Sequence, residues 1–289
     1  MANTTALKRR ITSVKNTKQI TKAMELVSAS KMRRAQDHAA SSRAFKNMAV
    51  DLLNRLSELT NVTDHPLYKQ RAVATHLYIF VTSDRGLAGA YNSNLFRVLT
   101  KELRQDVDLG IASKVIVVGK QGQRLVSKLE GVEVIAAYDG FSERPTVGDV
   151  RPILLETIDL FKTGAVDKAD VIYTDYKSSI AQEVELNTLL PAVFEPSENA
   201  DDREEKAIFE PSPAKVLDAV TERFIEVQLA QAFAEAQASE QSMRMMAMKN
   251  ATDNATELVD DLTLAFNTAR QAAITQELAE ISGGAEALK

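Results

Sequence analysis

Apolar residues recur at helical spacing over both ends of the chain, and neither end contains a residue that would break a helix. The first proline is Pro66, the first glycine is Gly86, and neither residue type occurs between Pro213 and Gly283. Because proline and glycine normally punctuate helices, each end is predicted to form one uninterrupted helix, of roughly 55 and 70 residues or about 80 and 100 Å. Ordinary globular helices average about 11 or 12 residues.

The C-terminal run has the alternating three- and four-residue spacing of a coiled-coil seam. The predicted seam consists of Ala255, Leu258, Leu262, Ala265, Ala269, Ala272, Gln276 and Ala279. Most of these side chains are small, which lets two helix backbones approach closely. At the N-terminus the stripe comes in pieces, Leu7/Ile11/Val14, Ile20/Met24/Val27, Met32/Ala35/Ala39 and Phe45/Met48/Leu52/Leu56/Leu59. Phase slips separate the early pieces, so we expect this helix to contact more than one surface.

The two long helices are predicted to pair with each other, antiparallel, with the middle of the chain inserted where it turns around. Their charges support this pairing. Residues 1–46 carry eleven Lys and Arg against two acids, a net charge of +9, whereas residues 251–289 carry seven acids against two cations, a net charge of −5. A compact bundle would need three or four comparable helices, which the middle lacks.

The middle of the chain alternates short apolar strands with helices of about 11 residues, a pattern typical of βαβ units and a mainly parallel sheet covered by helices. The predicted strands are "HLYIFVTSD", "KVIVVG", "VEVIAAY" and "DVIYTDY", and "EVELNTLLPAVF" is a candidate edge strand. The expected organisation is an N-terminal coiled-coil helix (1–60), a linker (61–75), an α/β domain (76–194), an acidic connector (195–213) and a C-terminal coiled-coil helix (214–289).

The α/β segment carries only weak signals for nucleotide or metal binding. Gly86 and Gly89 follow the first predicted strand without completing G-x-G-x-x-G, and "VGKQGQR" lacks the upstream glycine and the Ser or Thr of a P-loop. The histidines, His38, His65 and His76, belong to different elements and have no metal-ligand spacing. We therefore expect no cofactor and no metal.

No acid, base or nucleophile constellation stands out either. Asp84 and Arg85 end the first strand, where ligand sites of parallel sheets lie, but such a pair is more often a helix cap with its salt bridge. The chain contains no cysteine, which excludes disulfides and thiol catalysis and fits a reducing compartment. The N-terminus lacks the long apolar core of a signal peptide. We expect no catalytic site in this chain.

Two helical surfaces have no chemistry of their own. The segment "ITKAMELVSASKMRRAQ", residues 20–36, carries a dense set of cations. It is a solvated helix, a nucleic-acid stripe, or a surface that moves past acidic patches on another protein; nucleic acid is the weakest interpretation because stacking aromatics and a reading module are missing. The methionines between Met243 and Met248 are either gap-filling core or a deformable contact surface.

Three separated motifs resemble the gamma subunit of the F-type ATP synthase, a family of central rotor shafts. The first is "ITKAMELVSASKMRRAQ", the second is "TSDRGLAGAYN", and the third is "ARQAAITQELAEISGGA". The resemblance covers essentially the whole chain, and three motifs in the family's order are highly specific. Ala88 stands where many members carry cysteine, and the regulatory two-cysteine insertion of the chloroplast form is absent.

The resemblance implies a long antiparallel coiled coil inside a ring of three alpha and three beta subunits, with a Rossmann-like α/β domain that touches the epsilon subunit and the membrane-embedded c-ring. The implied function is that of a non-catalytic central-stalk rotor. It would couple ion-driven rotation of the c-ring to sequential conformational change and ATP synthesis or hydrolysis in the alpha/beta ring. The implied location is the cytoplasmic face of a bacterial plasma membrane, with membrane association through the c-ring only and no nucleic acid.

The resemblance also implies partner contacts. Lys22, Met24, Lys31 and Arg33 would face acidic loops of the beta subunits; Phe209 and Glu210 would lie against epsilon or the c-ring; Arg270, Gln271 and Thr275 would contact the ring; and Arg244, Glu277 and Glu280 would support coupling. Two other interpretations remain open from the residues themselves. One is a coiled-coil arm with a globular hinge in another ATPase assembly, and the other is an α/β enzyme with helical extensions.

Overall fold

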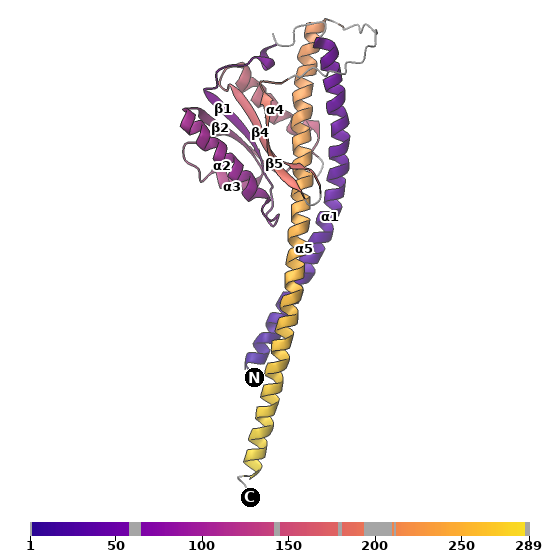
Figure 1. The fold of residues 1–289 in the computed structure, drawn as a ribbon, viewed down its shortest axis with the longest axis vertical. Coiled ribbons are helices and arrows are strands. Elements are labelled where there is room, and N and C mark those ends of the chain that lie inside the picture. Colours follow the sequence, from indigo (N-terminus) through magenta and orange to yellow (C-terminus); the bar gives the residue numbers. More distant parts are fainter. Residues whose placement is uncertain are drawn as a thin grey trace. The chain divides into compact units, whose positions relative to one another are not determined.

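The computed structural model describes residues 2–57, 65–141, 145–178, 181–193, 210 and 212–286. It comprises two compact units: residues 1–28 with 244–289, and residues 29–243. Two long helices, α1 (Ala2–Ser57) and α5 (Pro213–Glu286), contribute to both units (Figure 1). They contain 56 and 74 residues, so the prediction of one uninterrupted helix at each end is confirmed.

The second unit contains all the strands of the described chain. Its elements are the short 3-10 turn η2 (Pro66–Tyr68), the strands β1 (Thr75–Val81), β2 (Ala112–Val118), β3 (Glu133–Tyr138), β4 (Lys168–Tyr176) and β5 (Gln182–Leu190), and the helices α2 (Tyr91–Leu109), α3 (Lys120–Val126) and α4 (Val147–Lys162). The predicted linker, 61–75, thus includes η2, and most of the predicted acidic connector, 195–213, lies outside the described residues.

The strands form one sheet in the order β3-β2-β1-β4-β5. β1 pairs in parallel with both β2 and β4, β2 pairs in parallel with β3, and β5 runs antiparallel to β4. The predicted mainly parallel sheet with an added edge strand is therefore confirmed. Parallel neighbours need a crossover, and α2, α3 and α4 supply the three crossovers in chain order.

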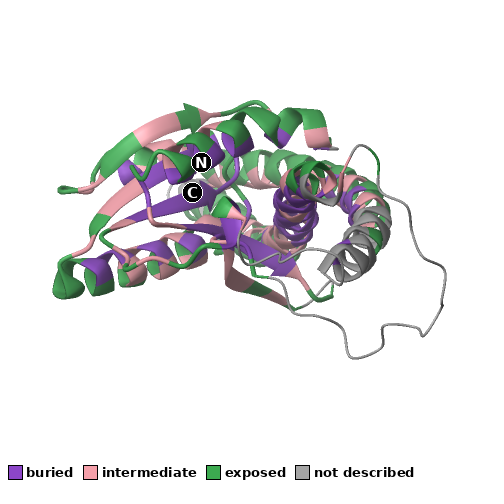
Figure 2. Ribbon diagram, turned by 90° about the horizontal axis from the view of Figure 1, so that it is seen from above, coloured by how far each residue is buried: buried purple, intermediate pink, exposed green. Residues whose placement is uncertain are grey.

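Helices cover both faces of this sheet, and alternation along β1 directs successive side chains to the two faces. Tyr78 and Phe80 join one cluster with Leu95 and Leu99 of α2. The opposite face, which includes Ile79, packs against α4 and against α5 residues such as Phe224, Ile225, Leu229 and Phe233. Figure 2 shows the buried residues of this unit in the sheet and on the helix surfaces facing it. α5 is thus also a core helix of the α/β unit.

Helix α4 begins earlier than its proline suggests. α4 begins at Val147, five residues before Pro152, and includes the proline in its interior. A capping box explains the start: the Thr146 backbone N–H donates to Asp149 Oδ2 at 2.7 Å, and the Thr146 side chain reaches the N3 backbone. The Thr146 hydroxyl also lies 2.8 Å from Asp149 Oδ2, and the hydrogen bonds that this carboxylate accepts from the Thr146 N–H and hydroxyl lower the pKa of Asp149. The capping box satisfies a backbone N–H of the first turn, whereas Pro152, five residues after the start of the helix, lacks the N–H that an interior helix residue donates.

A buried polar network ties the sheet to α2. His76 Nε2 lies 2.9 Å from Asp170 Oδ2, and Lys168 Nζ donates to the same oxygen at 2.7 Å. Asp106 of α2 accepts a hydrogen bond from the Tyr78 hydroxyl at 2.8 Å. Burial alone would raise the pKa of Asp170, but hydrogen bonds from His76 and Lys168 outweigh it, so that the pKa is lowered. His76, whose neighbours in sequence offer no carboxylate, thus lies beside carboxylates from distant parts of the chain.

Replacing Asp170 by Asn is expected to lower the free energy of unfolding by about 3 kcal/mol at neutral pH, because Lys168 and His76 lose a buried carboxylate. A lowered folded pKa stabilises the protein above the ordinary value of 3.8, and this contribution is lost as the pH falls through the folded pKa. Urea unfolding of the full chain at several pH values measures the difference between wild type and D170N, which should shrink in acid.

The exposed Asp108 of α2 provides a matched control, since D108N removes the same charge from a solvated position and should change stability little. A D170N defect that stays constant into strong acid would show that the carboxylate charge is not the stabilising feature.

Candidate functional site

In the first unit, residues 2–28 of α1 and 244–286 of α5 pack along a seam and run antiparallel (Figure 1). Buried or half-buried positions recur every three or four residues on each helix, as in a coiled coil. On α1 they are Thr4, Leu7, Ile11, Val14, Lys18, Thr21, Glu25 and Ser28. On α5 they are Met248, Thr252, Ala255, Val259, Leu262, Phe266, Ala269 and Ala273.

The predicted C-terminal seam is correct at three of its eight positions and wrong at the others. Ala255, Leu262 and Ala269 are in the seam, but the intervening positions are Val259, Phe266 and Ala273, one residue later than predicted. Alanine is frequent along this helix, so two registers fit the apolar pattern almost equally, and only the partner helix selects one. The true register contains Val259 and Phe266, so the seam is less dominated by small side chains than predicted.

The predicted phase slips in α1 are wrong as well. The seam continues without a slip because polar residues fill its middle, namely Lys18, Thr21, Glu25 and Ser28. Ile20 and Val27, which the apolar pattern assigned to the partner helix, are 60% and 53% exposed. A search for apolar spacing cannot detect a seam whose central members are polar.

A hydrogen bond between the two helices explains how this polar section is buried. The Thr252 hydroxyl of α5 donates to Thr21 Oγ1 of α1 at 2.9 Å, and the Thr21 hydroxyl donates to the Lys18 carbonyl oxygen at 3.1 Å. Both threonines are buried. The Thr252 hydroxyl also lies 2.8 Å from the Met248 carbonyl oxygen of its own helix. A polar pair within a seam favours one register over others, because a shift would break the hydrogen bond between the two helices.

The outer face of the α1 segment is cationic. The exposed cations before residue 29 are Lys8, Arg9, Arg10, Lys15 and Lys22. Lys22 forms an ion pair with Glu25 at 3.0 Å, and Met24 is half-buried beside them. In the second unit α1 continues with Arg33, which is exposed, and Lys31, which is half-buried. The four residues predicted to face the beta subunits therefore all lie on α1, two of them in each unit.

The last part of α5 extends past the seam as a single helix. Ala273 is the last half-buried residue before position 284, and positions 274–283 are all exposed. Arg270, Gln271, Thr275, Glu277 and Glu280, the residues predicted to contact a partner here, are exposed too. Thr275 donates to the Gln271 carbonyl oxygen at 2.9 Å, and Gln276 donates to Glu280 at 3.0 Å.

An apolar stripe on this single helix was missed by the sequence pattern. Ile274, Leu278 and Ile281 are 48%, 60% and 70% exposed, and their spacing of four and three places them on one helix face. The helical spacing of these three residues is visible in the sequence, but the neighbouring stripe through Ala272, Gln276 and Ala279 also has helical spacing and continues the predicted seam. Exposed apolar residues grouped on one helix face are typical of a contact with another protein.

The remaining predicted contact residues belong to other parts of the chain. Arg244 is buried within the chain, Glu210 is exposed, and Phe209 lies outside the described residues. Of the methionines, Met248 is buried and Met243, Met245 and Met246 are half-buried, which agrees with the core interpretation of this cluster.

The strand-end motif after β1 has a structural role. Asp84 accepts a hydrogen bond from the Lys120 backbone N–H at 3.1 Å, at the start of α3, and another from the Gly140 N–H at 2.9 Å. Ser83 and Asn92 are hydrogen-bonded to each other across the same loop. Asp84 thus joins the loops that follow three parallel strands, as a helix cap does, with both carboxylate oxygens occupied by backbone donors.

The described residues were also compared with the requirements of a metal site and of a membrane-spanning helix. Among the described residues, groups of three or more His, Cys, Asp or Glu side chains that could hold a metal ion are absent. Within the same ranges, no helix contains an apolar stretch long enough to cross a bilayer. Paired helices with an exposed charged and apolar surface, continuous in sequence with an α/β unit, are typical of a subunit that acts through contacts with other proteins.

Comparison with known proteins identifies the family. Residues 3–288 match a family model described as ATP synthase. The ATP synthase gamma chain of Heliobacterium modesticaldum is 37% identical over 288 residues, covering 98% of each chain. That of Acidithiobacillus ferrooxidans is 39% identical over 290 residues and covers 100% of both. The chain therefore belongs to the ATP synthase gamma chain family, the non-catalytic central-stalk rotor subunit of the F-type enzyme.

Solved structures show the same fold. A chain of the Euglena gracilis mitochondrial ATP synthase, from a structure of its OSCP, F1 and c-ring, has a TM-score of 0.69 at 17% identity, covering 99% of this chain and 95% of that chain. A chain of the Tetrahymena thermophila mitochondrial enzyme, from its central stalk and c-ring, has a TM-score of 0.62 at 23% identity, covering 80% of this chain and 99% of that one. The fold is thus retained at low identity.

The Thr21–Thr252 hydrogen bond can be tested by a double-mutant cycle. We expect T21V and T252V each to be destabilising and the double variant to be less so than their sum, with a coupling of about 1 kcal/mol. Urea unfolding of the four proteins measures this coupling. T12V is the control, since Thr12 is exposed and hydrogen-bonds only within its own helix among the described contacts. Strict additivity of the two substitutions would contradict a shared hydrogen bond.

Proposed function

We propose that this rotor subunit couples ion-driven rotation of a c-ring to sequential conformational change, and so to ATP synthesis or hydrolysis, in a ring of alpha and beta subunits. The observation that carries the proposal is the single helix at the end of the antiparallel pair, with its exposed apolar stripe and charged neighbours. Two further features support it: membership of the gamma chain family, and relatives solved together with F1 and the c-ring.

The physical basis is differential affinity. A binding partner shifts a conformational equilibrium only to the extent that it binds the competing states differently. Two helices of unequal charge and unequal length present a different surface in each direction around their axis. When such a pair turns inside three equivalent catalytic subunits, each subunit in turn meets a different surface and favours a different state.

The charged and apolar residues of the pair have distinct proposed roles. Lys22, Met24, Lys31 and Arg33 contact acidic loops of the beta subunits, where exposed lysine and arginine side chains make weak and repeatable ion pairs. Arg270, Gln271 and Thr275 make polar contacts with the ring, while Arg244, Glu277 and Glu280 support coupling. Ile274, Leu278 and Ile281 rest against apolar side chains of the ring. Such contacts suit a shaft that must turn, because none of them is a deep anchor.

The remaining proposed contacts, with the epsilon subunit and the c-ring, involve the other part of the chain. We infer that the segment at Phe209 and Glu210 lies against the epsilon subunit or the c-ring, and that membrane association is through the c-ring only. The protein then lies at the cytoplasmic face of a bacterial plasma membrane, a setting supported by the full-length bacterial relatives.

Isolation of native complexes tests the proposal as a whole. A tagged copy of the chain is expected to co-purify with alpha, beta and epsilon subunits, at one copy to three of the catalytic subunit. Quantitative mass spectrometry of the purified complex gives the ratio. Recovery with a different ATPase, or as a homodimer through the α/β unit, would favour the coiled-coil arm interpretation.

The end of α5 can be tested separately. Deletion of the chain from Ile274 onward is expected to weaken assembly and ATP-driven proton pumping, because it removes the apolar stripe and Glu277 and Glu280, while the α/β unit stays folded. Pumping is measured in membrane vesicles by quenching of a pH-sensitive dye, and folding by circular dichroism.

Two substitution variants sharpen this deletion test. Replacing Ile274, Leu278 and Ile281 together by serine should reproduce most of the deletion's effect, whereas I274L/L278I/I281L should keep pumping near the wild-type level, since apolar area is conserved. Wild-type assembly and pumping by the deletion would contradict the roles assigned to this end of the helix.

A further inference from the structure

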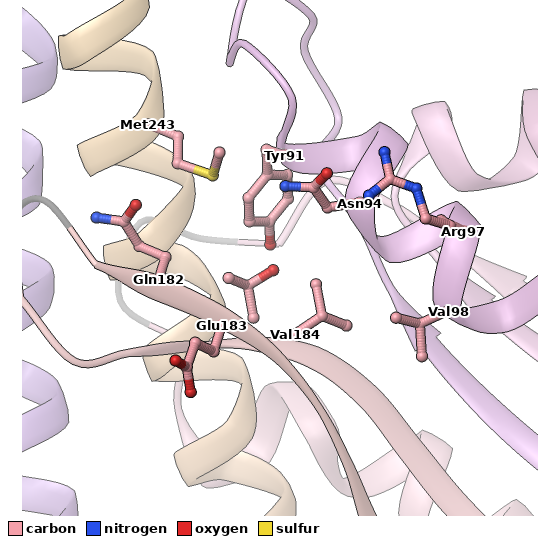
Figure 3. Close-up of a pocket in the computed structure, with 9 residues that line it drawn as sticks. Tyr91, Asn94, Arg97, Val98, Gln182, Glu183, Val184 and Met243 are labelled. Atoms are coloured by element: carbon pink, nitrogen blue, oxygen red, sulfur yellow. The ribbon is translucent and has the colours of Figure 1, made fainter.

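The second unit contains a cavity of about 440 Å³ that the rotor function does not use (Figure 3). It lies between α2, the β4–β5 edge of the sheet and α5, which together contribute all its lining residues. Its volume falls in the range of roughly 300 to 1,000 Å³ that is typical of small-molecule sites.

Apolar side chains form much of the cavity wall. Val98, Val184 and Met243 pack against the hydrophobic cluster beneath α2, and Tyr91 belongs to that cluster. The Tyr91 ring is 1% exposed, and its hydroxyl donates to the Ala236 carbonyl oxygen at 3.3 Å. In Figure 3 Met243 lies beside this ring, and Val98 and Val184 lie across the cavity from Met243. The cavity is therefore an opening into an apolar core, suited to an apolar ligand body.

A buried hydroxyl lines the same cavity. Thr174 of β4 is 2% exposed, and it pairs with Val184 in the β4–β5 ladder. Its Oγ1 has no hydrogen-bond partner within the described parts of the chain. Buried hydroxyl groups are nearly always hydrogen-bonded, and leaving one unpaired costs free energy. A polar atom of a bound molecule would satisfy it.

The charged residues that line the cavity are Arg97, which is exposed, and Glu183. Arg97 and Asn94 are one turn apart on α2, and both line the cavity (Figure 3). No carboxylate of the described residues lies within ion-pair distance of Arg97. Glu183 also lines the cavity, but alternation along β5 directs its side chain to the face opposite that of Gln182 and Val184. An anionic group near Arg97 would thus meet a cation and an amide.

We propose that this cavity binds a small amphipathic carboxylate that carries a second polar atom on an apolar, preferably aromatic, body. The carboxylate pairs with the Arg97 guanidinium and the Asn94 amide, the strongest hydrogen-bonding arrangement that these side chains offer. The body packs against Tyr91, Val98 and Met243. The second polar atom exchanges a hydrogen bond with the Thr174 hydroxyl.

Three related probes separate these contacts. The reference is 3-(4-hydroxyphenyl)propanoate, its amide lacks the charge, and 3-phenylpropanoate lacks the second polar atom. Titration of the purified full chain, followed by protein amide shifts in NMR spectra, measures each affinity. We expect the amide to bind about 10-fold more weakly than the acid and 3-phenylpropanoate several-fold more weakly, with the largest shifts at residues 91–98 and 182–184.

Variants of the protein test the same assignments. R97Q should abolish the preference for the acid over the amide, and R104Q, a substitution of an exposed arginine two turns along α2, should retain it. T174V should abolish the preference for the hydroxylated probe, and T174S, which keeps a hydroxyl, should retain most of it. Circular dichroism of each variant controls for folding.

Several outcomes would overturn the proposal. They are equal affinity for the acid and the amide, unchanged selectivity in R97Q and T174V, shifts confined to residues outside the cavity, and no shift up to the solubility limit of the reference probe. Because the titration uses the isolated chain, these outcomes leave the rotor function unaffected.

Discussion

The seam between α1 and α5 is the contact on which the first unit depends. A helix of this length cannot bury its apolar stripe against itself, and isolated helices in water are marginal. Each segment therefore needs the other to cover its three-four stripe. The apolar layers provide affinity, whereas the Thr21–Thr252 hydrogen bond provides a reason to prefer one register. Where the seam ends at Ala273, α5 continues with its apolar stripe uncovered.

The second unit has a different source of stability. Its parallel strands are buried on both faces, so helices must cover both, and α5 serves as one of them through Phe224, Ile225, Leu229 and Phe233. The same helix is thus a seam partner in one unit and a core element in the other. Buried carboxylates of the second unit are hydrogen-bonded to other residues of that unit. Asp170 pairs with His76 and Lys168, and Asp106 accepts a hydrogen bond from Tyr78. These buried carboxylates therefore stabilise the fold of the second unit.

The strand-end carboxylate has a structural role of the same kind. Asp84, placed where parallel sheets often hold ligands, has both carboxylate oxygens engaged by backbone N–H groups. What is exposed instead is a cationic helix face and an apolar stripe, which suit recognition of other proteins. The cavity beside Thr174 is the exception among the described residues, since it joins an apolar wall, an unpaired hydroxyl and a positive charge.

The sequence alone predicts the two long helices, the alternating α/β middle and the family, because helix breakers, periodicity and motifs are local signals that do not depend on a partner. It did not determine the seam. Lys18, Thr21, Glu25 and Ser28 are seam residues only because α5 lies against them, and the choice of Val259 and Phe266 over Leu258 and Ala265 depends on which face that partner covers. The partners of His76 and Asp84 were likewise invisible, since they come from strands and loops distant in sequence. Tertiary structure decided these points because burial and hydrogen bonding between elements have no counterpart in the spacing of residues along one element.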